Sequence, residues 1–435
     1  YSATGAISCW YSTDSGSTNL SEQVVGANWT DVISNEGSNI WNVYCNDSVG
    51  NENSSSVTFF RDITYPGINF TDPTPSDGSS QNVNSIYVNY SITETNDAYS
   101  FIDYDDSLVL WMRMDEVNGS WDPYDNSSYG NDGVLVGTAV INSSSGRFGD
   151  GLWCDGDSDY VEVADDATLN VPQKATFSAW IYPESYGDLG DVWIKNIYSD
   201  EDTSLTAVWR LGSDGNEGFK DRFGVNYNDG DNHDVKSTGT VPLNTWTHVA
   251  AVTDGTNIYF YFNGVLDSSQ SYSITPTQTS NKWWIGTKRD GAATARQFDG
   301  FIDEVMFFNR TLSTEEIVAL FNATKTYHNF TGQNDGDHTM TAHVVDLLGN
   351  VNSTEERTVS VDIAAPGIII TTPSNNFNST DPALDVNYTV SGSPQACWYI
   401  NDTMNSNVSL DDCSINITSV TWTEGQHNVT VWVND

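Results

Sequence analysis

The chain has 435 residues, of which 38% are hydrophobic and 12% aromatic, so it carries enough apolar material for packed cores and is not a disordered segment. Its 59 acidic and 16 basic residues give a net charge of −43, which disfavours nucleic acids and anionic membrane surfaces as partners. Frequent Thr, Val, Ile, Tyr and Trp, separated by Gly, Asn, Asp and Ser, predict an all-β protein of about three domains.

Glycosylation sequons and cysteines indicate the compartment. The sequon Asn-X-Ser/Thr occurs 19 times but is missing between Asn142 and Asn309, although that stretch is also rich in Asn. With five cysteines in no zinc or CxxC spacing, this patchiness predicts an N-glycosylated protein outside the cell or on its surface. The sequons lie at Asn19, Asn28, Asn46, Asn53, Asn69, Asn89, Asn118, Asn126, Asn142, Asn309, Asn322, Asn329, Asn352, Asn378, Asn387, Asn401, Asn407, Asn416 and Asn428.

Internal repeats set the expected domain boundaries. Residues Cys9-Trp10-Tyr11 recur as Cys397-Trp398-Tyr399, and an acid-Gly pair precedes an Asp by 11 residues in three copies. These pairs begin at Glu36, Asp335 and Glu424. The last two starts are 89 residues apart, a period typical of a small β-sandwich, whereas the first two are 299 apart. The difference leaves about 210 residues for a domain inserted within the second repeat.

An Asp-x-x-Gly-Asn turn before the last strand, at 47–51 and 346–350, resembles bacterial and archaeal immunoglobulin-like surface repeats. The resemblance covers 1–103 and 326–435 and implies β-sandwiches. A disulfide between Cys9 and Cys45 would then join two core strands. In the last repeat Val433 replaces Cys45, so we expect Cys397 to pair with Cys413.

The inserted segment 104–325 contains a series of blocks in a fixed order, which ends in one helix. Asn263-Gly264 predicts a tight hairpin turn, and Ser313 with Glu316 predicts a capping box for a helix whose Ile317 and Leu320 face inward. The blocks resemble the laminin-G-like, concanavalin A-type jelly roll; they read SLVLWMRMDE, GRFGDGLWCDGDSDYVEV, TFSAWIYP, NTWTHVAAVTDGTNIYFYFNGVL, WWIGTK and FDGFIDEVMFFNRTLSTEEIVALF.

The expected organisation is therefore three immunoglobulin-like repeats, the second of them split by a jelly roll. Because the first and last repeats are incomplete, we expect either an excerpt of a longer array, processed from a precursor, or strands supplied by a neighbouring subunit. The segments are 1–63 (partial repeat), 64–103 (first part of the split repeat), 104–325 (jelly roll), 326–363 (second part) and 364–435 (partial repeat).

The jelly-roll resemblance also implies a structural Ca²⁺ beside the turn after the first strand. The matching ligands are Asp125, Asn131 and Asp303, since calcium prefers oxygen ligands on turns. Alternatively, Asp125 and Asp303 only accept backbone amide hydrogen bonds that hold the turn. Cys154 is expected to be a buried thiol outside the disulfides.

Catalytic residues are not expected. Asp303 and Glu304 are neighbours on an alternating strand, so their side chains should point to opposite faces, and no Ser-His-Asp group or HExxH spacing occurs. One loop gathers three of the few basic residues beside aromatics, which predicts a ligand or partner contact. The alternative is that one Trp packs in the core and the cations balance nearby acids. The predicted contact residues are Trp283, Trp284, Lys288, Arg289 and Arg296.

Three functions compete. The first is a non-enzymatic structural segment of an archaeal or bacterial surface array, fibre or stalk, whose partners are other copies or adjoining repeats. The second is an adhesin that binds glycans or cell-surface proteins through the jelly roll. The third and least favoured is a glycoside hydrolase, which would require a single carboxylate substitution to abolish hydrolysis.

Overall fold

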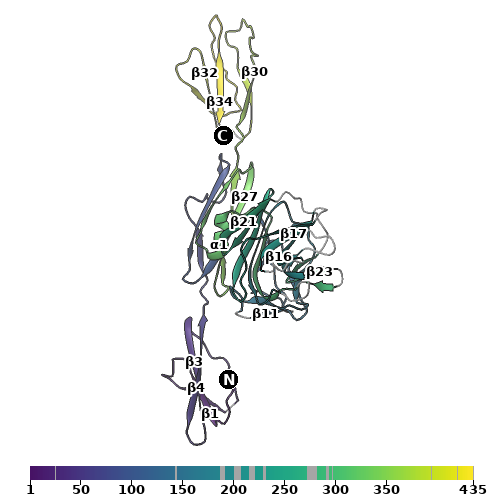
Figure 1. The fold of residues 1–435 in the computed structure, drawn as a ribbon. Helices are drawn as coiled ribbons and strands as arrows, with labels where there is room; N and C mark the ends of the chain where they lie inside the picture. The colour runs from purple at the N-terminus through teal and green to yellow at the C-terminus, as the bar shows by residue number, and fades with distance from the viewer. Residues whose placement is uncertain are drawn as a thin grey trace. The chain divides into compact units, whose positions relative to one another are not determined.

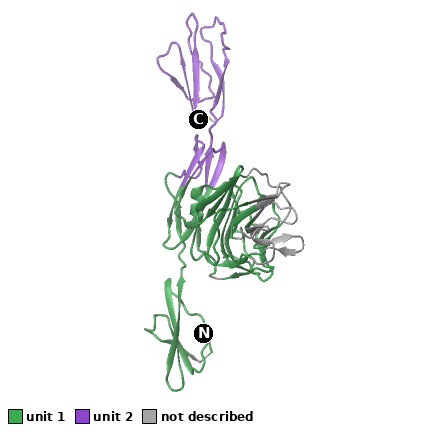
Figure 2. Ribbon diagram, viewed as in Figure 1, with its two compact units in different colours: residues 1–73, 89–328, 340–356 green, residues 74–88, 329–339, 357–435 purple. Residues whose placement is uncertain are grey.

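The computed structural model describes all residues except 25, 143–144, 187–191, 200–206, 215–220, 229–231, 272–281, 291–292, 296, 393, 419 and 435. The described part is built from strands with one α-helix, which confirms the all-β prediction (Figure 1). Within it, no helix has the length and apolar character needed to cross a membrane. The chain divides into two compact units (Figure 2): residues 1–73, 89–328 and 340–356 form one, and residues 74–88, 329–339 and 357–435 form the other.

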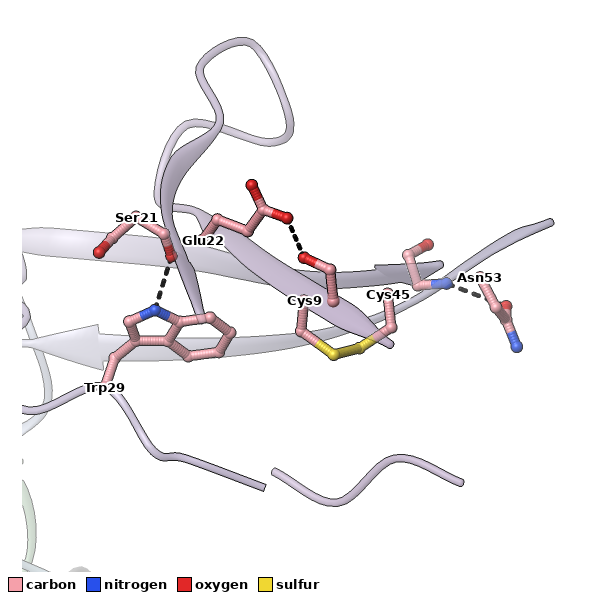
Figure 3. Close-up of a disulfide and its surroundings, with 8 residues drawn as sticks. Cys9, Ser21, Glu22, Trp29, Cys45 and Asn53 are labelled. Carbon is pink, nitrogen blue, oxygen red and sulfur yellow. Dashed lines mark hydrogen bonds between the residues drawn. A yellow bond between two sulfur atoms is a disulfide. The ribbon is translucent and has the colours of Figure 1, made fainter. Parts of the chain in front are cut away.

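The N-terminal strands form a four-stranded sheet in the order β2-β1-β3-β4. Cys9 lies directly opposite Cys45 in the β1–β3 register, and the two form a disulfide (Figure 3), which confirms this predicted pairing. The indole nitrogen of Trp29 donates to the backbone oxygen of Ser21. The strands are β1 (Ser8–Ser12), β2 (Leu20–Val24), β3 (Gly37–Asn46) and β4 (Glu52–Arg61).

The Asp-x-x-Gly-Asn turn has the same hydrogen bonds in two places. Asp47 accepts from the backbone N–H and the side-chain amide of Asn51, and Asp346 accepts in the same way from Asn350. The glycine of each turn, Gly50 or Gly349, has a positive φ that a side chain would disfavour. Two segments almost 300 residues apart therefore repeat in structure as well as in sequence.

The C-terminal strands repeat the N-terminal pairing. Cys9 faces position 45 in the β1–β3 ladder, and Cys397 faces Val433 in the β32–β34 ladder, so the register is preserved at an offset of 388. Cys397 instead bonds to Cys413, as predicted. The strands are β30 (Gly367–Thr372), β31 (Asn387–Ser391), β32 (Ala396–Asn401), β33 (Val408–Leu410) and β34 (Val429–Asn434), and their core contains Val386, Tyr388, Tyr399, Ile417, Val420 and Val431.

Strands from before and after the jelly roll pair with each other. β8 runs antiparallel to β27, with Ala98 opposite Asp346 and Tyr104 opposite Met340. The chain thus leaves one sheet and returns to it, as an inserted domain requires. The immunoglobulin-like class of these strands, and the five segment boundaries, stay predictions. The strands are β5 (Gly67–Phe70), β6 (Ser79–Gln81), β7 (Ser85–Thr93), β8 (Ala98–Tyr104), β26 (Tyr327–Thr331), β27 (Gly336–Asp346), β28 (Val351–Ser353) and β29 (Arg357–Val361).

The jelly roll consists of two antiparallel sheets. The front sheet has the order β10-β13-β22-β15-β16-β17-β18, and the back sheet has the order β11-β12-β25-β14-β19-β20-β21, with β9 also paired to β25. The front strands are β10 (Gly133–Val136), β13 (Tyr160–Val163), β15 (Val192–Ser199), β16 (Ala207–Asp214), β17 (Phe223–Asn228), β18 (Asn232–Lys236) and β22 (Trp283–Ile285). The back strands are β9 (Leu108–Met112), β11 (Val140–Asn142), β12 (Gly151–Asp155), β14 (Lys174–Pro183), β19 (Thr247–Asp254), β20 (Asn257–Phe262), β21 (Val265–Ser271) and β25 (Asp299–Phe308).

Back-sheet strands are buried on both faces. On β14, Phe177 and Ile181 point into the core between the sheets, whereas Trp180 points into a second core on the outer side. This second core also contains Tyr99 from β8 and Val345 from β27. The nearly continuous apolar sequence of β14 follows from this two-sided burial.

The helix α1 (Thr314–Asn322) adds to the second core. Ser313 accepts from the backbone N–H of Glu316, whose carboxylate accepts from the backbone N–H of Ser313, so the predicted capping box is present. Ile317 and Leu320 are buried, as predicted. A 3-10 turn (Ala167–Leu169) and a short hairpin of β23 (Lys288–Asp290) and β24 (Ala293–Ala295) complete the jelly roll.

Candidate functional site

The two tryptophans of β22 point to opposite faces of the front sheet. Trp283 is 2% exposed and packs in the core between the sheets, with ring centroids 5.9 Å from Trp209 and 5.3 Å from Phe307. Trp284 faces outward, opposite Glu162 in the ladder with β13. Trp283 is therefore a core residue, which leaves Trp284 as the tryptophan of this pair on the ligand-accessible side of the sheet.

Trp284 belongs to a small polar cluster. Its indole nitrogen donates to Glu162 at 3.3 Å, and the ammonium group of Lys282 lies 2.5 Å from the other oxygen of the same carboxylate. The Lys282 side chain is 52% exposed and that of Glu162 is 19% exposed, whereas Trp284 is 5% exposed. The cluster offers a cation and a carboxylate at the surface, held in place by an indole N–H. The alternating segment Tyr160–Val163 could have indicated Glu162 from sequence, because its valines face inward.

The basic residues predicted beside these tryptophans are not compared with this cluster. Lys288 and Arg289 lie on β23, of which the structure describes only the backbone, and Arg296 lies outside the described residues. A ligand contact by these three residues stays a prediction.

Asp125 holds the turn that follows β9. One of its carboxylate oxygens accepts from the backbone N–H of Trp111 at 2.8 Å and of Ser127 at 3.0 Å. The other accepts from the Ser127 hydroxyl and from the backbone N–H of Asn131, both at 2.7 Å. The side-chain amide of Asn131 donates to the backbone oxygen of Val109 at 2.9 Å. These hydrogen bonds match the alternative in which Asp125 secures the turn.

Asp303 holds a different loop. Its carboxylate accepts from the backbone N–H groups of Arg147 at 2.7 Å and Phe148 at 3.0 Å, and it shares no partner with Asp125. In the described residues, no three His, Cys, Asp or Glu side chains come together as a metal-binding group. The arrangement gives calcium no donor group beyond these hydrogen-bonded carboxylates, so calcium stays a prediction without structural support.

Asp303 and Glu304 point to the same side of β25, so the expectation of opposite faces was wrong. Their neighbours Ile302 and Val305 both face the core between the sheets. A register shift in the β14–β25 ladder and a φ of 49° at Glu304 mark a bulge. Because a bulge inserts one extra residue, both carboxylates face the second core.

Glu304 lies at the centre of a buried polar cluster on that side. One of its oxygens accepts from the hydroxyl of Tyr99 at 2.5 Å and from the indole nitrogen of Trp111 at 2.9 Å. The guanidinium of Arg113, which is fully buried, lies 3.8 Å from the other oxygen and 2.6 Å from Asp115. Arg113 also donates to the backbone oxygen of Gly349, in the turn after β27. The cluster thus joins the jelly roll to the returning strand.

Burial sets the protonation of this cluster. Removal from water raises the pKa of Glu304 to about 7 and that of Asp115 to about 8, despite the opposing positive charge of Arg113. Burial and the charge of Glu304 also raise the pKa of Asp303. Raised carboxyl pKa values often mark catalytic acids. Here Asp303 and Glu304 are 0% and 2% exposed, so they are enclosed rather than aimed into a cleft.

Most sequons lie on accessible side chains, with one clear exception. Asn401 is 4% exposed, and its side-chain oxygen accepts from the backbone N–H and hydroxyl of Thr403. A glycan could not reach this amide in the folded protein. Cys154 is buried and forms no disulfide, as predicted.

Three solved structures with low similarity illustrate the comparison. Domain 4 of AbnA, an extracellular GH43 arabinanase from Geobacillus stearothermophilus in complex with arabinotriose, is 19% identical with a TM-score of 0.39; the match covers 49% of this chain and 98% of that one. The binding domain of Paraclostridial Mosquitocidal Protein 1 is 15% identical with a TM-score of 0.40, over 65% and 76%. A CBM40 domain of the Ruminococcus gnavus IT-sialidase, bound to α2,3-sialyllactose, is 14% identical with a TM-score of 0.33, over 39% and 96%.

No curated protein sequence matches this chain. One family model does match, over a segment that runs from the end of β12 into α1. The segment contains the tryptophans of β22, Glu162, Asp303 and Glu304. Residues 155–318 thus match the concanavalin A-like lectin/glucanases superfamily, as the resemblance to a laminin-G-like jelly roll predicted.

Proposed function

We propose that this chain is a non-enzymatic extracellular protein that binds glycans or proteins through its jelly roll, which the flanking β-strands hold on a cell surface. The observation that carries the proposal is the two-sided burial of the back sheet. Since β8, β27 and α1 cover its outer face with Tyr99, Val345 and Leu320, a ligand reaches the jelly roll at the front sheet and the rim loops. A jelly roll fixed from behind is suited to display its front.

The enclosed carboxylates support binding rather than hydrolysis. A glycosidase needs two carboxyl groups beside a bound sugar, one of them able to donate a proton to the leaving group. Glu304 is bonded to Tyr99 and Trp111 instead, and Asp303 is bonded to the backbone of Arg147 and Phe148. Hydrolysis of a glycan by the wild-type chain that Glu304→Gln abolishes would contradict this part of the proposal.

The repeated turns and disulfides support a place in a surface assembly. Asp47 and Asp346 form the same turn, and each sandwich end has its own disulfide, as expected of repeated modules in an oxidising environment. Other copies or adjoining repeats would be the partners in such an array. Electron microscopy of the native material would show a filament or lattice, whereas isolated monomers would remove this part.

The binding function is tested on the front-sheet cluster. We expect the intact chain to bind members of a glycan array or extracellular proteins, and Lys282→Ala combined with Glu162→Gln to weaken that binding. Lys174→Ala is a matched control, because Lys174 is an exposed lysine on the back sheet. If neither glycans nor proteins bind, the proposal fails; if the double variant and the control bind equally well, the ligand lies elsewhere on the jelly roll.

A further inference from the structure

Trp121 sits in a backbone conformation that disfavours it. Its φ is 70°, in the left-handed region where bulky side chains are outliers. Its backbone N–H donates to the carbonyl of Asn118 at 3.0 Å, and Val117 pairs with Pro123 in an antiparallel bridge. This is a three-residue hairpin loop with Trp121 at the position that usually takes glycine. We call residues 117–123 the Trp121 hairpin.

Folding does not account for a tryptophan at this position. Two other long side chains with positive φ in the described residues are explained by burial: Met114 is 1% exposed in the core, and Glu304 is 2% exposed within its hydrogen bonds. The remaining non-glycine residues of this kind are Ser, Asp, Asn and Ala. Trp121 is 68% exposed. It therefore combines backbone strain with an exposed ring, a combination found at ligand-binding sites.

The Trp121 hairpin is rigid and lies along the edge of the front sheet. The Asn118 side chain accepts from the backbone N–H groups of Ser120 and Asp122 and donates to the Asp122 carboxylate. The same carboxylate accepts from the backbone N–H of Leu135 on β10 at 2.8 Å, and Gly133 of that strand donates to Pro123. The strand β10 forms one edge of the sheet. The ring of Trp121 is thus held out from a fixed loop.

Two further apolar side chains are exposed in the same place. Tyr124 follows the hairpin and is 42% exposed, and Val134 is 50% exposed between the two β10 residues that bond to the hairpin. The nearby acids have partners already: Glu116 pairs with Arg113, and Asp122 holds the hairpin. The surface around the ring is therefore apolar and aromatic with hydroxyl and amide groups, and it attracts neither strong anions nor strong cations.

We propose that Trp121 is a stacking platform for the ring of a neutral pyranose sugar, at the β10 edge of the front sheet. The apolar face of a pyranose fits an exposed indole ring, and the net charge of −43 disfavours sialylated, sulfated or uronic acid glycans. The inference deepens the proposed function by naming the ligand class and a contact residue. It rests on that function but on none of the residues of the Trp284 cluster.

The test uses the full chain, produced without N-glycosylation so that no glycan on Asn118 covers the ring. Pentasaccharides of β-1,4-linked glucose, mannose and xylose, and their sulfated forms, are titrated by calorimetry. We expect a neutral probe to bind, and both Trp121→Ala and Trp121→Gly to weaken it by at least about tenfold. Trp121→Tyr should keep most of the affinity. Tyr65→Ala is the matched control, because Tyr65 is 65% exposed but has no positive φ.

Stability separates a binding residue from a structural one. Because glycine relieves the strain, Trp121→Gly should raise the melting temperature by about 2–4 °C while it removes binding. A fall in melting temperature would mean that the ring supports the fold, which overturns the proposal. So would full affinity in both Trp121 variants, or a preference for sulfated probes. If affinity is lost only with Lys282→Ala and Glu162→Gln, the hairpin inference fails and the proposed function stands; if neither glycans nor proteins bind, both fail.

Discussion

The Nε atom of Arg113 lies 3.8 Å from a carboxylate oxygen of Glu304, and the two side chains are 0% and 2% exposed. The pair sits where the jelly roll meets β8 and the turn after β27, since Glu304 accepts from Tyr99 and Arg113 donates to Gly349. Buried charges of this kind fix the relative position of two elements, because each is costly to leave unpaired.

Removal of one charge should therefore destabilise the jelly roll. We expect Arg113→Met to lower its free energy of unfolding by about 3–5 kcal/mol, since Glu304 and Asp115 would be left buried without a cation. Lys282→Met removes a half-exposed ion pair and should cost less than about 1 kcal/mol. Calorimetric melting measures both, and equal losses would show that the buried pair has no special role.

The same cluster predicts a fall in stability at higher pH. Burial raises the pKa of Glu304 to about 7 and that of Asp115 to about 8, so the folded state holds protons that the unfolded state has released. Their contribution is full below about pH 4 and is lost as the pH rises through 7 and 8. We expect Glu304→Gln to flatten this decline in melts between pH 5 and 8.

Two histidines act in the opposite direction. Burial lowers the pKa of His343 to about 4 and that of His248 to about 3, so both are neutral when folded and charged when unfolded in mild acid. Their contribution is lost as the pH falls from about 6.5 through 4. His343→Gln should reduce the acid sensitivity of the melting temperature, and an unchanged acid limb would contradict the assignment.

The C-terminal disulfide should contribute strongly to its small core. Cys397 and Cys413 close a loop of 16 residues, which corresponds to about 3 kcal/mol in the chain-entropy model. We expect Cys397→Ser with Cys413→Ser to lower the melting temperature of that module. Reductant should have no further effect on this module of the double variant, and a fall there on reduction would mean that another disulfide stabilises it.

Asp125 should stabilise its turn with or without calcium. Because its carboxylate accepts from the backbone of Trp111, Ser127 and Asn131, we expect Asp125→Ala to lower stability by about 2 kcal/mol. The loss should be equal in calcium and in chelator. Calcium-dependent stabilisation of the wild type that disappears in the variant would instead restore the predicted metal site.

Much of the fold follows from local patterns in the sequence. The 388-residue offset between Cys9 and Cys397 indicated repeated strand pairs, and the structure gives both pairs the same register. Ser313 and Glu316 indicated the capping box because its hydrogen bonds span three residues. Such features depend on neighbours in the chain, or on the spacing of whole repeats, and so are visible before folding.

The site depended on contacts that no spacing encodes. A bulge turned Glu304 to the side of Asp303, against the alternation that the sequence indicates. Asp125 and Asp303, expected near one cation, hold separate loops. Trp121 lay in a segment that the sequence marks only as turn-rich.

The sequence by itself determined the all-β class, the repeats, the two disulfide pairs and the jelly roll, because hydrophobic periodicity and residue spacing specify strands and their order. Tertiary structure decided which side chains remain accessible. Burial depends on what packs against each face, so only the folded chain shows that Glu304 is enclosed and that the ring of Trp121 is exposed.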